Sequence, residues 1–221
     1  MSNVVAQAAP LLKAAGFRKR RYVFNRTTEP GLVQVVWFWM GPFEPPGPGS
    51  EKHRAAREVM GLRGDHYGTF TIRLGVYVAE MLRKDETPPA DWVTIVKCHL
   101  RKPIGALLAD GDDDVWWSLD RSDIAADLAI DALQTAGLPW LNRLASRDSI
   151  LATYESTGRL GIGLFGWPAR IAWLLKDRDR AKAEAMLRNY LQEDLSPGHR
   201  RLMEGWMRDE GFGHLLDETQ G

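Results

Sequence analysis

Strict alternation of apolar and polar side chains over residues 70–78 constrains the fold of this chain more than any other feature. The apolar phase holds Phe70, Ile72, Leu74, Val76 and Val78, and the other phase holds Thr71, Arg73, Gly75 and Tyr77. Successive side chains of a β-strand point to opposite faces. The segment is therefore predicted to be a strand with one core face and one polar face, as is typical of antiparallel sheets.

Further segments complete this sheet and back it with helices. The other strands are predicted at residues 21–26, 32–40, 92–100 and 115–119. Helices are predicted at residues 4–15, 122–136, 168–176, 179–193 and 197–208. Gly16 and Gly137 are predicted to end the first two helices, because glycine readily adopts the left-handed conformation of a C-cap. Pro30 and Gly31 mark the turn of a hairpin.

The fold class that follows is α+β: a mostly antiparallel sheet of about five strands backed by helices, with a C-terminal helical extension. We predict a sheet domain over residues 1–157 and a helical extension over residues 158–221 that packs on it. Residues 41–68, which are rich in proline at their start, form a long connection between two predicted strands. A connection of that length usually covers or binds something.

Composition limits the choice of partner and compartment. Lys plus Arg equals Asp plus Glu at 29 each, so no overall field draws the chain to nucleic acid or to an acidic membrane. The only cysteine is Cys98, which excludes an internal disulfide and fits a reducing cytoplasm. No apolar run approaches the length of a membrane span. We predict a cytoplasmic protein with no membrane partner, and nucleic acid is an unfavoured partner.

Four segments form a recognisable series along the chain: Gly16-Phe17-Arg18-Lys19 with the basic-aromatic strand after it, Gly31-Leu32-Val33-Gln34, Phe70-Thr71-Ile72-Arg73-Leu74-Gly75-Val76 and Cys98-His99-Leu100-Arg101. In this order they resemble a bacterial family named domain of unknown function 4304. The resemblance spans about residues 7–119 and is weaker beyond. It implies the helix-backed sheet described above and implies no activity. The 41–68 connection is longer than in the family pattern, and Trp37-Phe38-Trp39 replaces a more polar sequence.

Motifs of common chemistries are weak or absent. Gly161-Ile-Gly163-Leu-Phe-Gly166 matches G-x-G-x-x-G. A dinucleotide-binding site needs a strand before this motif and a second strand that ends in an acidic residue after it, and neither strand is predicted here. Asp110 to Asp114 lacks the ligand spacing of a calcium loop and is predicted to be a solvated turn. Arg18 to Arg21 is predicted to be a solvent-exposed segment at the start of a strand. The other interpretations are that it binds phosphate or an acidic protein. No cofactor is predicted.

Histidine spacing and the lone thiol also argue against a metal or a catalytic dyad. The five histidines show no zinc-ligand spacing, so no metal site is predicted. Cys98 and His99 are neighbours on a predicted strand and would point to opposite faces, which prevents them from acting as a pair. Cys98 is predicted to be a small core residue.

The candidate binding residues lie on the polar side of the predicted sheet: Arg73, Tyr77, His99, Arg101, Trp37 and Trp39. Trp, Tyr and Arg are the residue types that concentrate binding energy. The first hypothesis is a non-enzymatic cytosolic protein, such as an immunity or accessory protein, that binds another protein through this open face. The alternative is a small-ligand binder or enzyme with a polar pocket around Arg73, Tyr77 and His99. A clustered pocket with a buried, pKa-shifted His99 would favour the alternative, and a flat or convex face would favour the first.

Overall fold

An antiparallel sheet with helices on one face forms the first part of the molecule. The computed structural model describes residues 1–41, 66–82, 86–108, 114–158, 160 and 167–218. Its strands are β1 (Arg18–Arg20), β2 (Val23–Glu29), β3 (Leu32–Met40), β4 (Thr69–Val78), β5 (Leu100–Pro103) and β6 (Trp117–Ser118). They lie in the order β1-β2-β3-β4-β5, with β6 also paired to β4, and every pairing is antiparallel. The predicted α+β class is confirmed.

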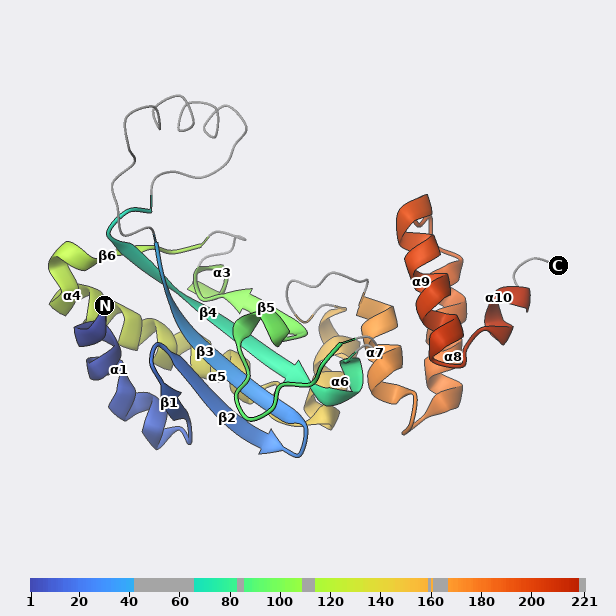
Figure 1. Ribbon diagram of the computed structural model, residues 1–221, viewed down its shortest axis with the longest axis horizontal. Helices are drawn as coiled ribbons and strands as arrows, with labels where there is room; N and C mark the ends of the chain where they lie inside the picture. The colour runs from blue at the N-terminus through green and yellow to red at the C-terminus, as the bar shows by residue number, and fades with distance from the viewer. Residues whose placement is uncertain (42–65, 83–85, 109–113, 159, 161–166, 219–221) are drawn as a thin grey trace, which may run out of the picture.

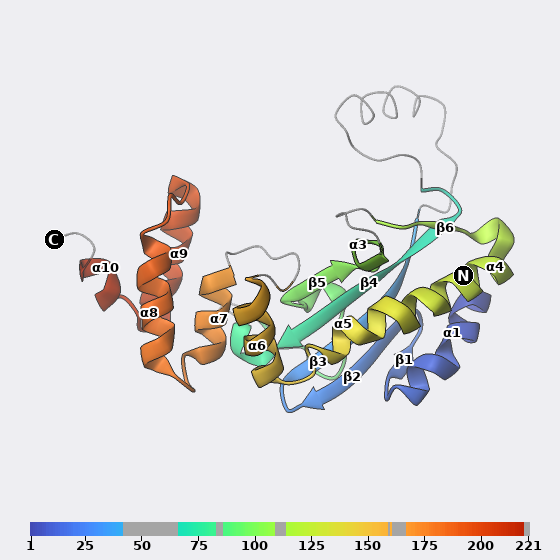
Figure 2. The same cartoon turned by 180° about the vertical axis from the view of Figure 1, so that it is seen from behind.

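Helices cover one face of this sheet and continue beyond its end. They are α1 (Ser2–Ala14), α3 (Gly105–Leu108), α4 (Ser122–Ala132), α5 (Leu138–Asn142), α6 (Arg147–Thr157), α7 (Trp167–Leu175), α8 (Arg180–Leu191), α9 (Pro197–Asp209) and α10 (His214–Glu218). Figure 2 shows α1, α4 and α5 in front of the sheet. Figure 1 shows α6 and α7 beside the end of β4, with α8, α9 and α10 farther out.

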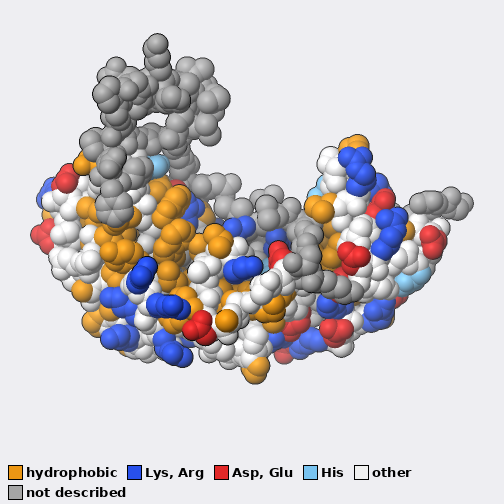
Figure 3. Space-filling model, in the orientation of Figure 1, with side chains coloured by type: hydrophobic (Ala, Val, Ile, Leu, Met, Phe, Trp, Pro, Cys, Tyr) orange, Lys and Arg blue, Asp and Glu red, His pale blue; other side chains and the backbone are white. Residues whose placement is uncertain are grey.

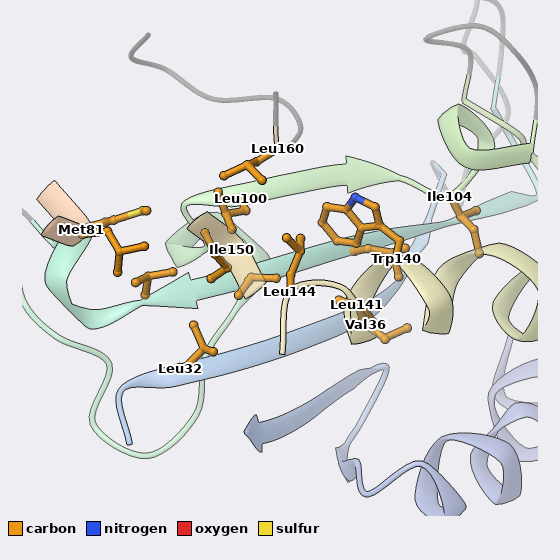
Figure 4. Packing of buried hydrophobic residues seen from close by; sticks show 14 of the residues in the cluster. Leu32, Val36, Met81, Leu100, Ile104, Trp140, Leu141, Leu144, Ile150 and Leu160 are labelled. Carbon is orange, nitrogen blue, oxygen red and sulfur yellow. The ribbon is translucent and has the colours of Figure 1, made fainter. Parts of the chain in front are cut away.

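The core lies between the sheet and its helices. Leu32 and Val36 of β3 meet Leu141 and Leu144 from the α5 region, and all four side chains are buried (Figure 4). The same cluster includes buried residues of the C-terminal helices, among them Trp173. Apolar burial on this scale is the main favourable contribution to folding. The division at residue 157 stays a prediction.

The register of β4 matches the alternation in the sequence. Its five apolar residues all belong to the helix-facing core, and Leu74 is fully buried opposite Val36 of β3. Replacement of Leu74 with Ala is expected to lower the free energy of unfolding by ~2–5 kcal/mol, because it removes buried methyl groups and leaves a cavity. Denaturant titration measures this change, and a loss below about 1 kcal/mol would contradict the role of Leu74 in the core.

Two local predictions differ from the structure. Arg18–Arg20 is a strand of its own, and Arg21, at a φ of 55°, turns the chain into β2. Gly137 does not end α4: it has a helical φ of −66°, and a π-turn over Leu133–Gly137 joins α4 to α5. A Cβ on Gly137 would lie 3.3 Å from the Cδ1 of Ile104. This glycine therefore serves close helix-to-sheet packing rather than a cap.

Candidate functional site

The face of the sheet opposite the helices holds the predicted site residues. On β3 it presents Val33, Val35, Trp37 and Trp39, and on β4 it presents Thr71, Arg73, Gly75 and Tyr77. Trp37 lies opposite Arg73, and Val33 lies opposite Tyr77. Figure 3 views this face and shows hydrophobic side chains over the upper part of the sheet, with Lys and Arg side chains gathered below them.

The segment before β5 crosses this face instead of extending the sheet. The strand predicted at residues 92–100 is wrong: only Leu100–Pro103 pairs with β4, and Ile95–Lys97 is a 3-10 turn. Val93, Ile95 and Cys98 pack on Val35 and Tyr77 as a second buried cluster. The part of the predicted open face around Val35 and Tyr77 is thus covered.

Two residues of the sheet hold this segment in place. The side-chain amide of Asn25 donates to the carbonyl oxygen of Val93 (3.0 Å) and accepts from the Val93 N–H (2.8 Å). A Cβ on Gly75 would lie 2.6 Å from both the Sγ of Cys98 and the Cδ1 of Ile95. The segment can approach the sheet closely because Gly75 has no side chain.

Tyr77 and His99 lie beneath and beside this segment, not on a solvated face. Tyr77 is only 5% exposed, and its ring centroid lies 5.2 Å from that of His99. The Nδ1 of His99 accepts from the backbone N–H of Val78 (3.1 Å), and its carbonyl oxygen accepts from Arg170 (2.5 Å). Burial raises the pKa of Tyr77, with smaller contributions from the carboxylates of Glu80 and Glu86.

His99 is held in its neutral form at physiological pH. Burial, together with the positive charges of Arg170, Arg101 and Lys97, lowers its pKa to about 3. A general acid or base works best with a pKa near the operating pH. Cys98 is 4% exposed, and burial raises the pKa of its thiol, so the reactive thiolate is disfavoured.

The remaining four candidates meet in a groove at the uncovered end of this face. The groove has a volume of about 320 Å³, and its walls include Trp37, Trp39, Arg73, Arg101 and Pro103. Ile95 and Val96 of the crossing segment close one side. We call this site the Trp-Arg groove. It unites Trp37, Trp39, Arg73 and Arg101, whereas Tyr77 and His99 do not line it.

The aromatic wall of the groove extends beyond the predicted residues. Trp37 and Trp39 stack at 5.7 Å between ring centroids, and Trp39 contacts Trp116 at 5.4 Å. His66 stacks on Trp116 at 3.8 Å, with 13° between the ring planes. Sequence analysis missed His66 and Trp116 as parts of this surface, because their contacts join segments that are far apart in the chain.

Arg73 is held in place by a neighbouring carboxylate. Its guanidinium forms an ion pair with Asp114 and lies 5.0 Å above the ring of Trp39. Asp114 also accepts from the hydroxyl of Thr71 (2.8 Å). The acidic residue thus neutralises Arg73 and fixes its side chain across the face of the tryptophan, where a cation is favoured. Asp114 was assigned to a solvated turn, yet its side chain is only 9% exposed.

Arg101 supplies the other charge of the groove. It has no ion pair within the part of the chain that the structure describes, and its Nε is buried without a hydrogen-bond partner. Arg101 lies opposite Gly75 and so shares the face of the groove, whereas Lys102 lies opposite Leu74, whose side chain faces the helices. One end of the groove therefore has positive charge that no described carboxylate neutralises.

Other sequence motifs add no second site within the described residues. Gly161, Gly163 and Gly166, residues 110–113 and residues 42–65 of the long connection lie outside those residues. Among the residues described, no three His, Cys, Asp or Glu side chains gather as a metal site would require. In the same residues, no helix has the length and apolar character needed to cross a bilayer.

Comparison with known protein families gives a match over part of this chain. No curated protein and no solved structure matches this chain. The family match begins at residue 52, so β1, β2 and β3 lie outside it, and it extends through α4 into the residue after α5. Residues 52–143 match the model of the family described as Domain of unknown function (DUF4304), and the family resemblance is confirmed over that segment.

Proposed function

We propose that this chain is a cytosolic, non-enzymatic protein that binds another protein through the Trp-Arg groove. The observation that supports this most is the meeting of two tryptophans and two arginines from three strands in one concave site. Trp and Arg are enriched among the residues that dominate protein–protein binding energy. Rings held by stacking lose little conformational entropy when a partner binds.

The chemistry around the groove favours binding over catalysis. His99 has a pKa of about 3 and its Nδ1 is occupied by a backbone amide, so it does not serve as a proton shuttle near neutral pH. The groove itself is walled by aromatic, aliphatic and cationic side chains. Guanidinium groups stay charged at neutral pH and bind anions, but they seldom exchange protons. A cytosolic location is consistent with the single buried thiol of Cys98.

A small molecule is the second candidate for the same groove, and its concave shape favours that candidate. At about 320 Å³ the groove is at the small end of the ~300–1,000 Å³ range of ligand pockets. Its wall continues onto Trp39, which is 39% exposed, and Val96, which is 71% exposed. A surface that extends past the pocket suits a protein side chain with its flanking backbone better than a fully enclosed ligand.

Replacement of Trp39 with Ala tests the proposal. It removes the exposed ring in the centre of the aromatic wall, so the affinity for the native partner is expected to fall at least about tenfold, as for an interface hot spot. Affinity purification from the native cell identifies the partner, and titration with the purified partner measures the dissociation constant.

Leu128→Ala is the matched control, because Leu128 is 51% exposed on α4, on the helical side of the sheet. Its affinity should equal that of the wild type, and thermal melting of both variants checks the fold. Equal affinities of wild type and Trp39→Ala for the purified partner would exclude the groove as the binding surface.

A further inference from the structure

We propose that the Trp-Arg groove recognises an acidic segment of its partner, with an aromatic side chain on the tryptophan wall and a carboxylate on Arg101. This inference rests on the proposed function and names the chemistry of the partner. It depends on the uneven charge of the groove, on its aromatic wall and on its size.

Charge complementarity identifies the anionic part of the ligand. Arg73 already has Asp114 as its partner, whereas Arg101 has no ion pair among the described residues. Arg101 lines the groove, and its buried Nε has no hydrogen-bond partner there. A carboxylate matches the planar fork of a guanidinium and can accept two hydrogen bonds from it.

The same face has further positive charge on its β1 side. Arg20 pairs with Val23, and Val23 pairs with Trp37, so the three residues share one row across the sheet on the face of the groove. Arg20 is exposed, and the ion pair that it forms with Asp91 among the described residues is 3.9 Å long and also exposed. Exposed pairs at this distance contribute little. Arg20 therefore remains available to a second acidic residue of the partner.

The aromatic wall identifies the apolar part of the ligand. Trp37 and Trp39 stack on each other, and Pro103 and Ile95 complete an apolar lining around them. An aromatic side chain packs on such rings in offset or edge-to-face geometry and gains more than burial alone. An aromatic ring of the partner that packs on Trp37 and Trp39 lies in the same groove as Arg101. The residues next to that ring in the partner are then the ones that face Arg101.

The size of the groove favours a peptide over a nucleic acid strand. Stacked aromatic side chains with cations also suit single-stranded nucleic acid, which needs a positive track along several phosphates. Here Asp114 neutralises Arg73 in the middle of the site. The unneutralised charge of Arg101 is confined to one end of a groove of about 320 Å³. This arrangement accommodates one anionic group beside one ring.

Peptide titration on the full chain tests this inference. The probe is an amidated hexapeptide with a central Phe flanked by Glu, and the readout is the indole N–H signals of Trp37 and Trp39 in NMR spectra. Two comparison peptides replace Phe with Ala or every Glu with Lys, and an oligothymidylate tests nucleic acid. The acidic Phe peptide is expected to bind at least about tenfold more tightly than each of the other three, and more weakly as salt is raised.

Charge reversal locates the carboxylate contact. Arg101→Glu is expected to weaken binding of the acidic Phe peptide at least about tenfold, because it replaces attraction by repulsion. Arg201→Glu changes the net charge equally at an exposed position on α9 and should leave the affinity within about twofold. Thermal melting confirms that both variants fold.

Three results would overturn the inference: no shift of the indole signals with the acidic Phe peptide, tighter binding of the oligothymidylate, or equal loss in both charge-reversal variants. These results are separable from failure of the proposed function. If the native partner still loses affinity on Trp39→Ala while the acidic peptide does not bind, the groove binds a protein of different chemistry.

Discussion

Cys98 in a Gly75→Val variant is expected to react with a thiol reagent about ten to a hundred times faster than in the wild type. The valine side chain would occupy the space that the Sγ of Cys98 and the Cδ1 of Ile95 fill, since even a Cβ would approach both to 2.6 Å. Overpacking of this kind costs ~1–3 kcal/mol, and each 1.4 kcal/mol changes an opening equilibrium about tenfold. Since Cys98 is the only cysteine, the labelling rate reports directly on opening of the crossing segment.

Gly205→Val is the matched control for this experiment. A Cβ on Gly205, within α9, would meet nothing within 4 Å, so labelling of Cys98 should stay at the wild-type rate. Asn25→Ala removes the two hydrogen bonds to Val93 and should also speed labelling. Wild-type labelling rates in both Gly75→Val and Asn25→Ala would show that the segment is not held by these contacts.

Acid is expected to destabilise the protein through His99. The pKa of His99 in the folded protein is about 3, whereas it is ~6.5 in an unfolded chain. Between these values the unfolded state binds a proton that the folded state does not, so the free energy of unfolding falls as pH is lowered from about 6.5 towards 3. For this one group the slope is at most about 1.4 kcal/mol per pH unit.

A His99→Asn variant isolates that contribution. Its side-chain oxygen can still accept from the N–H of Val78, but it does not titrate. Denaturant titrations at several pH values should therefore show a shallower loss of stability in the variant below pH 6.5, and parallel behaviour of the two proteins above pH 7. Identical slopes across the acid range would mean that His99 is protonated as readily in the folded state as in the unfolded chain.

Local patterns in the sequence predicted the sheet but not what covers it. The alternation of β4 gave its register because each residue of a strand has only two faces to choose from. The 92–100 segment imitates such a strand: Val93 and Ile95 are buried two residues apart. The next buried residue is Cys98, three positions on, because a 3-10 turn intervenes. This spacing of buried residues is not visible in the sequence, because the contacts behind it, with Asn25 and Gly75, come from positions far away in the chain.

The sequence predicted which side chains share the face of the candidate site, but not which of them are buried there. Trp37, Trp39, Arg73 and Arg101 follow from strand phase and proximity in the sheet, and the structure brings them together. Tyr77 shares that phase, yet it is buried because the crossing segment covers it. The partner of Arg73 is Asp114, which comes from a segment beyond β5. The alternation along a strand assigns each side chain to one face of the sheet. Whether that face is exposed to solvent depends on tertiary contacts.

Arg147 has a consequence for the order in which the molecule forms during synthesis. Its guanidinium pairs with Glu29 and Glu80 and donates to the carbonyl oxygen of Pro30 (2.8 Å), across up to 118 positions of sequence. A ribosome that has just released β4 and the Ala79–Met81 turn after it has therefore delivered both carboxylates but not their cation. Until α6 emerges, the β2–β3 turn and the end of β4 lack this bridge, and contacts of such long range close late. The completed sheet depends on residues made well after its central strands.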